Sequence, residues 1–304
     1  MNDVHIPVLV EEISFWLNPL PGGVYVDCTV GLGGTSLKLL EKSGKNAHII
    51  GLDRDYQAVA IAKKTLSEYE SSVNIEHGNF SHIKDVVQKS GYEKVDGVVF
   101  DLGVSSMQLD QPERGFSFSQ SGPLDMRMDQ TQKVTAADLV NHLPEKELAD
   151  VIFTYGEERY SRRIARAIVQ ARNVSLIQTT QALVAVLEGA LPYAYKKGRL
   201  HFATRTFQAL RIRVNRELDL IEPALRDAVD LLKEGGRVCV VAFHSLEDRI
   251  VKQTFRSMAK REHPSVALLV KKPVIPSVLE IQQNPRARSA KLRVAERLPE
   301  GVTL

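Results

Sequence analysis

The sequence predicts a doubly wound α/β fold, in which a parallel sheet carries helices on both faces and is interrupted by an inserted α-helical domain. Short apolar runs alternate with helical patterns over residues 24–101. Residues 110–215 show helical spacing without a strand pattern, and a buried-strand pattern returns at residues 237–243. We therefore expect a sheet domain made of residues 1–109 and 216–304, with residues 110–215 inserted as a helical domain.

The composition is typical of a globular protein. The chain has 304 residues, a net charge of +3 and an isoelectric point near 8.7, so a nucleic-acid surface would require local clustering of basic residues. Cys28 and Cys239 fall in apolar strand-like runs, which favours buried, reduced thiols. The sequence has no secretory signal pattern, no run that could span a bilayer and no Cys/His spacing typical of structural zinc. We expect a cytoplasmic protein without a bound metal.

The first strand-like run, residues 24–27, leads into a glycine-rich turn and a helix that begins near Ser36 and ends near Gly44. A second strand follows and ends at Asp53, about 20 residues past the glycines, where an acid can accept hydrogen bonds from a ribose. The third glycine of a dinucleotide-binding loop is missing. This favours S-adenosylmethionine, which has no pyrophosphate, over NAD. A purely structural turn is the alternative.

Two more predicted strands, residues 73–77 and 95–101, extend this pattern. Phe80 follows the first of them and could cover an adenine ring, with ordinary core packing as the alternative. The apolar spacing is helical at residues 10–17, ahead of the first strand, and at residues 56–69, after Asp53. Ligands of open α/β sheets bind outside the carboxyl ends of the strands. We therefore expect four strand-end residues to converge on one site: Asp27, Asp53, Phe80 and Asp101.

Basic charge concentrates in the predicted helical insert, where arginines lie on one side of a helix and alternate with aromatic residues. Arginine forms bidentate contacts with phosphate, and aromatic rings stack on bases, so this pattern favours RNA or DNA contact. A solvated charged face is the alternative. The candidate contact residues are Arg159, Arg162, Arg163, Arg166, Arg205 and Arg211.

The chain returns to an α/β pattern after the insert. A helix over residues 221–232 is expected to stop at Gly235-Gly236, and a buried strand over residues 237–243 leads to His244. A basic loop then precedes a short last strand, residues 292–295. Two arginines of this loop join the candidate RNA contacts, Arg286 and Arg288.

With these motifs in place, the chain resembles the RsmH/MraW family, bacterial methyltransferases that act on the N4 of a cytidine in 16S ribosomal RNA. The motifs occur in order over nearly the whole length, which is far more specific than one glycine loop. The matching stretches are His5–Leu9, Asp27–Thr29, Gly31–Gly34, Asp101–Ser106, Gln108–Asp110, Arg114–Phe118, Leu124–Met128, Thr206–Arg211 with Asn215, His244–Arg249 and Asn284–Arg293.

This resemblance implies a class I methyltransferase sheet, S-adenosylmethionine as methyl donor, and 16S rRNA in the decoding region of the small ribosomal subunit as substrate. The family usually has histidine after the paired glycines, whereas this chain has Thr35, so we expect backbone N–H contacts there. The residues that the resemblance places against the donor are Gly33, Gly34, Thr35, Asp53, Phe80, Asp101 and Gln108.

Cytosine N4 is a poor nucleophile because its lone pair is delocalised into the ring, so a site must hold the amino group and aim it at the methyl carbon. We expect Asp101 to accept hydrogen bonds from the donor or the amine, and Ser105 and Ser106 to contact the substrate. His244 is the candidate proton acceptor, with a purely structural role as its alternative. The proline-pair turn of many amino methyltransferases is absent, so an aromatic residue of the insert is expected to help hold the base, the candidates being Phe116 and Phe118.

Two other functions stay open at this stage. An NAD-dependent oxidoreductase would share the strand–turn–helix unit, and a non-catalytic RNA-binding assembly factor would share the arginines. S-adenosylmethionine binding and methyl transfer to small subunits would distinguish these alternatives. The oligomeric state, including a homodimer, is also left open.

Overall fold

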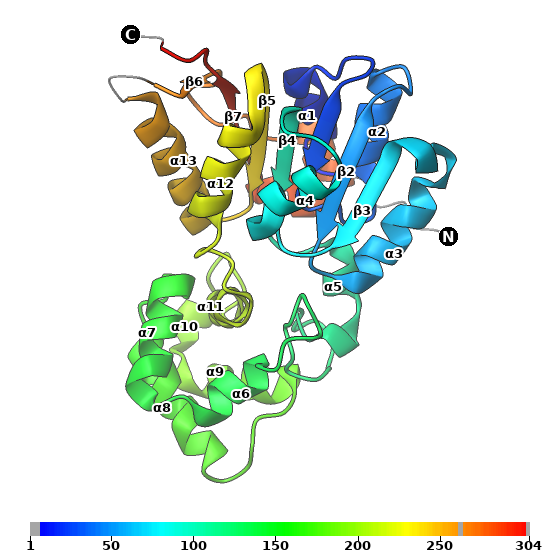
Figure 1. Ribbon diagram of the computed structural model, residues 1–304. Helices are drawn as coiled ribbons and strands as arrows, with labels where there is room; N and C mark the ends of the chain where they lie inside the picture. The colour runs from blue at the N-terminus through cyan, green and yellow to red at the C-terminus, as the bar shows by residue number, and fades with distance from the viewer. Residues whose placement is uncertain (1–6, 261–263, 302–304) are drawn as a thin grey trace. The chain divides into compact units, whose positions relative to one another are not determined.

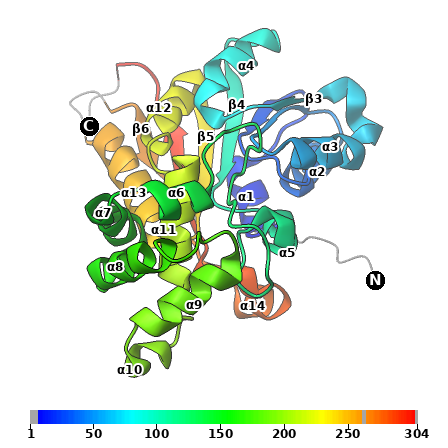
Figure 2. The ribbon, with the colours of Figure 1, turned by 90° about the horizontal axis from the view of Figure 1, so that it is seen from below.

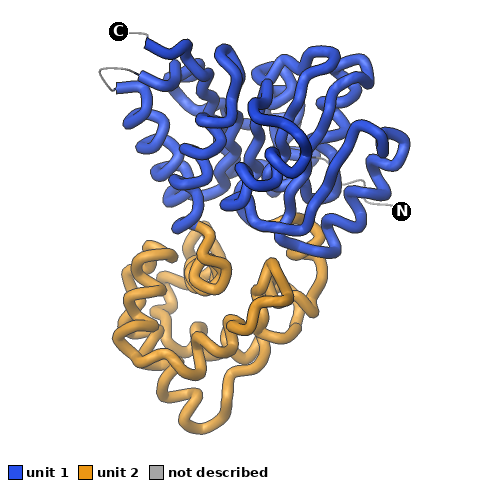
Figure 3. Tube along the Cα trace, viewed as in Figure 1, with its two compact units in different colours: residues 1–103, 218–304 blue, residues 104–217 orange. Residues whose placement is uncertain are grey.

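The computed structural model describes residues 7–260 and 264–301, and the chain divides into two compact units. The first unit comprises residues 1–103 and 218–304, and the second comprises residues 104–217 (Figure 3). The sequence-based boundaries lie a few residues away, after residues 109 and 215. Two residues of the first family motif, His5 and Ile6, lie outside the described part of the chain.

The first unit is built on a seven-stranded sheet with the order β3-β2-β1-β4-β5-β7-β6 (Figure 1). Strands β1 to β5 are parallel, and β7 pairs antiparallel with both β5 and β6. Chain order reverses between β1 and β4, which is where ligands of such sheets bind. The predicted fold class is therefore confirmed. The strands are β1 (Val24–Asp27), β2 (His48–Asp53), β3 (Val73–His77), β4 (Val95–Asp101), β5 (Leu232–Ala242), β6 (Val266–Leu268) and β7 (Lys291–Arg297).

Helices cover both faces of this sheet because its strands are apolar on both sides. Val26 and Val98 belong to one hydrophobic cluster, together with residues of α4, α12 and α13. Their chain neighbours Tyr25 and Val99 belong to the other cluster, together with residues of α1, α2 and α3, as side-chain alternation along a strand requires. The helices are α1 (Val10–Leu17), α2 (Gly34–Lys42), α3 (Tyr56–Thr65), α4 (Ile83–Lys89), α12 (Ile221–Leu231), α13 (Ser245–Ala259) and α14 (Val278–Gln283).

The second unit is helical and has its own core (Figure 2). In α8 the buried residues Ile164, Ala165 and Ile168 recur at helical spacing, so one amphipathic face holds the helix in place. The exposed arginines of this helix are Arg162, Arg163 and Arg166. The helices of this unit are α5 (Ser106–Asp110), α6 (Ala136–His142), α7 (Glu145–Gly156), α8 (Ser161–Arg172), α9 (Thr180–Ala190), α10 (Tyr193–Lys196) and α11 (Thr204–Asn215).

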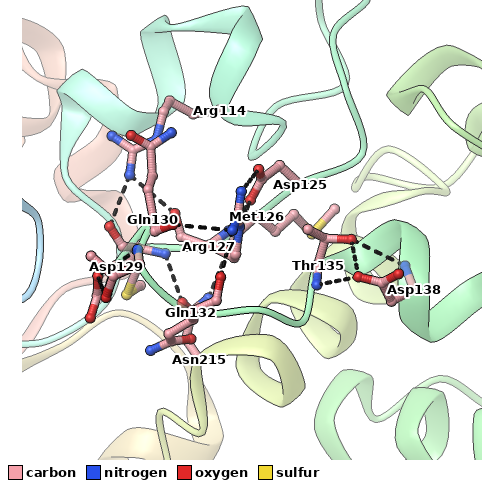
Figure 4. A network of polar contacts seen from close by, with 12 residues as sticks. Arg114, Asp125, Met126, Arg127, Asp129, Gln130, Gln132, Thr135, Asp138 and Asn215 are labelled. Carbon is pink, nitrogen blue, oxygen red and sulfur yellow. Dashed lines mark hydrogen bonds and ion pairs between the residues drawn. The ribbon is translucent and has the colours of Figure 1, made fainter.

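A buried polar network holds the long loop between α5 and α6 onto the end of α11 (Figure 4). The Asn215 side chain accepts the N–H of Met128 at 2.8 Å and donates to the carbonyl of Met126 at 2.7 Å. The buried Arg114 donates to the carbonyls of Arg127 and Met128 at 3.1 and 2.9 Å. These side chains satisfy backbone groups that the loop cannot pair by itself. They thereby fix the loop conformation, including the left-handed backbone of Met126.

The boundary between α12 and β5 differs from the sequence-based expectation. The helix expected to run to residue 232 ends at Leu231, and β5 already begins at Leu232. The glycine pair therefore lies inside the strand, where the register between β4 and β5 is irregular. Gly235 adopts a φ of 76°, which an L side chain rarely adopts.

Both cysteines are buried and free, as the sequence predicted. Within the described residues, no helix combines the length and apolar composition needed to cross a bilayer.

Candidate functional site

Three parallel strands of the first unit end in aspartates at one edge of the sheet: Asp27 on β1, Asp53 on β2 and Asp101 on β4. The turn after β1 links these ends. Thr29 accepts the N–H of Asp101 through its side-chain oxygen at 2.6 Å, and Asp53 accepts the N–H of Gly31 at 2.9 Å. The predicted convergence of these three strand-end carboxyl groups is therefore present in the fold.

Asp27 and Asp53 hold the glycine-rich turn. Asp27 is buried and accepts hydrogen bonds from the Ser36 hydroxyl at 2.8 Å and from the Thr29 N–H at 3.3 Å. Asp53 also accepts the N–H of Asp55 at 2.8 Å, so backbone groups contact both of its carboxylate oxygens. Burial raises the pKa of Asp27 and of Asp53 to about 6 each. Asp53 can still accept from a ribose diol, because each carboxylate oxygen has a second lone pair.

Asp101 is the most perturbed carboxyl group at this edge. Burial, together with the charges of Asp27 and Glu247, raises its pKa to about 8. Among the residues that the structure describes, no group donates a hydrogen bond to the buried Oδ1 of Asp101. A buried carboxyl oxygen without a donor is costly to ionise, so this position favours a protonated acid or a cationic, donor-bearing ligand.

The turn after β5 contributes His244 and Glu247, which form a capping box at the start of α13. The buried Glu247 accepts the N–H groups of Phe243 and His244 at 2.8 and 3.2 Å. Its own N–H lies 3.4 Å from Nδ1 of His244, and its Oε1 lies 3.2 Å from Nε2. Nδ1 of His244 therefore caps α13, which favours the structural alternative for His244, whereas the buried Nε2 has no hydrogen-bond partner among the described residues.

The glycines of the turn after β1 have different roles. A Cβ on Gly34 would lie 2.4 Å from Cγ of Pro7, and one on Gly33, whose φ is 88°, would lie 3.3 Å from Cγ of Leu66. A Cβ on Gly31 would meet only a carbonyl oxygen, at 3.8 Å. Gly33 and Gly34 thus allow close packing of the chain, whereas Gly31 borders open space. The side chain of Thr35 is mostly buried, so a ligand would meet this residue chiefly through its backbone.

Phe80 packs in the hydrophobic core, with its ring perpendicular to that of Phe100 at a centroid distance of 5.7 Å. It is 9% exposed, so at most one edge of the ring is available to an adenine. This placement agrees with the core-packing alternative. Contact with the donor stays a prediction.

Ser105, Ser106 and Gln108 belong to the second unit. Ser105 and Gln108 form the capping box of α5: the Ser105 hydroxyl accepts the Gln108 N–H at 3.2 Å, and the Gln108 side chain accepts the Ser105 N–H at 3.1 Å. Gln108 is nearly fully buried. The two serines and Gln108 are described only within this unit, so their contacts with donor and substrate stay predictions.

The two phenylalanines proposed to hold the base are already packed. Phe116 is 6% exposed and belongs to the core of the second unit. Phe118 stacks on His201 at a centroid distance of 4.5 Å and meets Phe207 edge-on at 5.2 Å. Of the two, only the partly buried Phe118 has a ring edge that could reach a substrate.

The candidate RNA-binding arginines separate into two groups. Arg211 forms a two-bonded ion pair with the buried Glu217, at 3.0 and 2.9 Å, and Arg205 donates to the carbonyl of Glu157. These contacts stabilise the second unit. The other group consists of exposed side chains, Arg159, Arg162, Arg163 and Arg166 in the second unit and Arg286 and Arg288 in the first.

The sequence analysis missed Glu247. The spacing His-x-x-Glu after a buried strand is a capping-box pattern and could have located it. What the sequence could not provide was the proximity of Glu247 to Asp101, which depends on β4 and β5 being neighbours in the sheet.

The edge of the sheet fits a cationic adenosyl ligand. Oδ1 of Asp101, which has no hydrogen-bond donor, and the nearby carboxyl groups of Asp27 and Glu247 favour a positively charged ligand. Gly31 leaves room beside Asp53 for a close approach to the backbone.

Comparison with known proteins agrees with this geometry. The profile of the MraW methylase family matches residues 2–298. A protein of Clostridioides difficile strain 630 named "Ribosomal RNA small subunit methyltransferase H" is 46% identical, and the match covers 97% of this chain and 99% of that protein. A protein of the same name from Geobacter sp. strain M21 is 48% identical, with 97% and 98% covered.

Proposed function

We propose that this chain, which belongs to the MraW methylase family, methylates the exocyclic N4 of a cytidine in the decoding region of 16S ribosomal RNA. S-adenosylmethionine is its methyl donor. Methylation of ribosomal RNA, without the base and the atom, follows from the family and from relatives named as small-subunit rRNA methyltransferases. The base and the atom are our proposal. A ribosomal substrate would place the enzyme in the cytoplasm. We propose that residues 104–217 recognise the RNA.

The observation that carries the proposal is the carboxyl group of Asp101, with its buried, unpartnered Oδ1 at the end of β4. An exocyclic amine presents two N–H donors, and a carboxylate is the acceptor that can hold one of them and orient the nitrogen lone pair. When bound, S-adenosylmethionine supplies an electrophilic methyl group on a positively charged sulfur. We assign Asp101 to hold the amine in the orientation that transfer requires.

We also assign the proton-accepting role to Asp101 rather than to His244. The methylated nitrogen must lose a proton, and a carboxyl group with a pKa of about 8 before ligand binding is suited to receive it near neutral pH. Nδ1 of His244 accepts the N–H of Glu247 as the cap of α13, so this ring nitrogen is already used to hold the start of the helix. The contacts of Asp27 with Thr29 and Ser36 hold the turn through which Asp53 is positioned for the donor's ribose.

The test is transfer of a labelled methyl group to small subunits from a strain that lacks this gene, followed by mass spectrometry of 16S rRNA nucleosides. We expect N4-methylcytidine to form, and Asp101→Ala to abolish its formation. Transfer to another base, or to a ring carbon of cytosine, would refute the assignment of the reacting atom. Full turnover by Asp101→Ala would refute its assigned role.

A further inference from the structure

A buried glutamate organises a cluster of arginine and tyrosine side chains where α8 begins and α10 approaches it. Glu158 is 0% exposed. One of its carboxylate oxygens accepts the N–H of Tyr160 at 2.8 Å, and the other accepts the hydroxyl of Tyr195. A buried carboxylate that is fixed in this way orients both tyrosines, which lie on different helical segments.

The two tyrosine rings are edge-to-face, with centroids 5.1 Å apart and planes at 78°. Burial and the hydrogen bond to Glu158 raise the pKa of Tyr195 to about 12, so its hydroxyl remains a donor throughout the physiological range.

The guanidinium of Arg159 lies over both rings, 4.9 Å from the centroid of Tyr160 and 5.4 Å from that of Tyr195. Stacking of this kind uses the faces of the guanidinium and leaves its N–H groups, which point outward in its plane, available to a ligand. Arg159 is exposed, and within the described residues it forms no ion pair with a carboxylate. The same holds for Arg162 and Arg163 on the first turn of α8.

The short helix α10, which carries Tyr195, also offers an exposed aromatic ring. Tyr193 on α10 is 68% exposed, and the Lys197 amine lies 4.8 Å from its ring centroid. A base could stack on Tyr193 while its phosphate remains within the field of the lysine. Exposed aromatic rings together with arginines that form no ion pair are the combination that single-stranded nucleic-acid sites use, whereas a protein partner would favour a larger apolar patch.

We propose that Glu158, Arg159, Tyr160, Tyr193 and Tyr195 form a site for unpaired nucleotides of ribosomal RNA, in which Arg159 binds a phosphate and Tyr193 stacks on a base. Glu158 is a positioning residue: it does not contact the RNA, but it holds the rings on which Arg159 lies. This inference rests on the proposed function only for the identity of the RNA. The site itself selects flexible RNA over duplex, because a paired base cannot stack on Tyr193.

The inference is tested by fluorescence anisotropy with a labelled single-stranded 12-nucleotide RNA and with a duplex of the same sequence, over a series of salt concentrations. We expect Arg159→Ala to weaken binding about tenfold and to lower the salt dependence by the equivalent of about one phosphate contact. Tyr193→Ala should weaken single-strand binding by about fivefold or more, and Tyr193→Phe should restore it because the ring remains.

Glu158→Gln tests the positioning role. This substitution keeps Arg159 and both tyrosines. A loss of RNA affinity together with an unchanged salt dependence therefore identifies a lost orientation of Arg159 rather than a lost phosphate contact. Lys64→Ala on α3 is the charge-matched control, and we expect it to bind as the wild type does. Donor affinity and melting temperature, measured on every variant, separate a folding defect from a local effect.

The inference fails if Arg159→Ala and Tyr193→Ala bind the single strand as tightly as the wild type, or if the wild type binds the duplex equally well. This result is independent of the proposed function. A wild-type enzyme that methylates small subunits while these variants bind RNA normally would overturn only the site. A wild-type enzyme that binds the single strand through Arg159 but transfers no methyl group would overturn only the proposed reaction.

Discussion

The charge state of Asp101 gives the sharpest test of the donor site. In the ligand-free protein, the ionised carboxylate is disfavoured by on the order of 5 kcal/mol, because each pH unit between the ordinary value of 3.8 and about 8 corresponds to about 1.4 kcal/mol. A sulfonium bound beside Asp101 favours the ionised form. Below about pH 8, donor binding must therefore release the proton of Asp101, and donor affinity must fall as the pH is lowered.

The magnitude follows from this linkage. The bound sulfonium is expected to return the pKa of Asp101 most of the way to its ordinary value. Donor affinity then falls by roughly tenfold per pH unit between pH 8 and pH 6, or roughly 100-fold in all. The donor's amino group also titrates, so S-adenosylhomocysteine, which has the same amino group and an uncharged sulfur, is the matched ligand. Calorimetry should show the pH-dependent preference for the sulfonium in the wild type and in the surface control Asp85→Asn, and its loss in Asp101→Asn.

The stability of the ligand-free protein gives a second measurement with a definite sign. The folded-state pKa of Asp101 is raised, so the stability that its proton contributes is fully present below about pH 4 and is lost as the pH rises through about 8. Asp101→Asn removes this titration, and its melting temperature should exceed that of the wild type at pH 9. If the wild type prefers the sulfonium over S-adenosylhomocysteine by the same factor at pH 6 and at pH 8, donor binding is not linked to the charge of Asp101 and the reasoning is refuted.

Three further substitutions test the scaffold. Gly34→Ala places a methyl group against Pro7, and we expect a clear loss of donor affinity by calorimetry; unchanged affinity would show that the turn can move aside. Asn215→Ala leaves buried backbone groups unpaired and should cost about 2–4 kcal/mol in urea unfolding, whereas a cost below 1 kcal/mol would mean that the loop is held elsewhere. Arg211→Ala leaves Glu217 buried without its bidentate partner and should cost about 3 kcal/mol, against less than 0.5 kcal/mol for the exposed Arg213→Ala; equal effects would refute the structural role of Arg211.

The sequence predicted the sheet because its strands follow simple rules. Residues 24–26 and 98–100 are continuous apolar runs followed by acids, as buried parallel strands often are, and the order of elements fixes which edge they share. The strand β6 was missed because three residues carry no measurable periodicity. The early start of β5 at Leu232 was missed because Gly235-Gly236 is normally a stop signal.

The candidate site could be predicted only as far as strand ends are visible in the sequence. Asp27, Asp53 and Asp101 were found in this way. The partners of Arg211 and Asn215 could not be found, because a helix pattern shows that a side chain is polar but not which buried group it meets. The same limit applies to Arg159: its charge and its chain neighbour Tyr160 were visible in the sequence, but the contact with Tyr195 comes from a later segment of the chain.

The distribution of charge explains why donor and RNA sites are built from different elements. The donor site needs buried carboxylates, whose raised pKa values favour a cation, and buried parallel strands provide them at a shared edge. The RNA site needs the opposite sign at the surface, where a helix can present arginines on its solvent face while its other face packs in a core. An insert with its own core can present this arginine-bearing face without using any strand of the sheet for it, so neither charge pattern limits the other within its own unit.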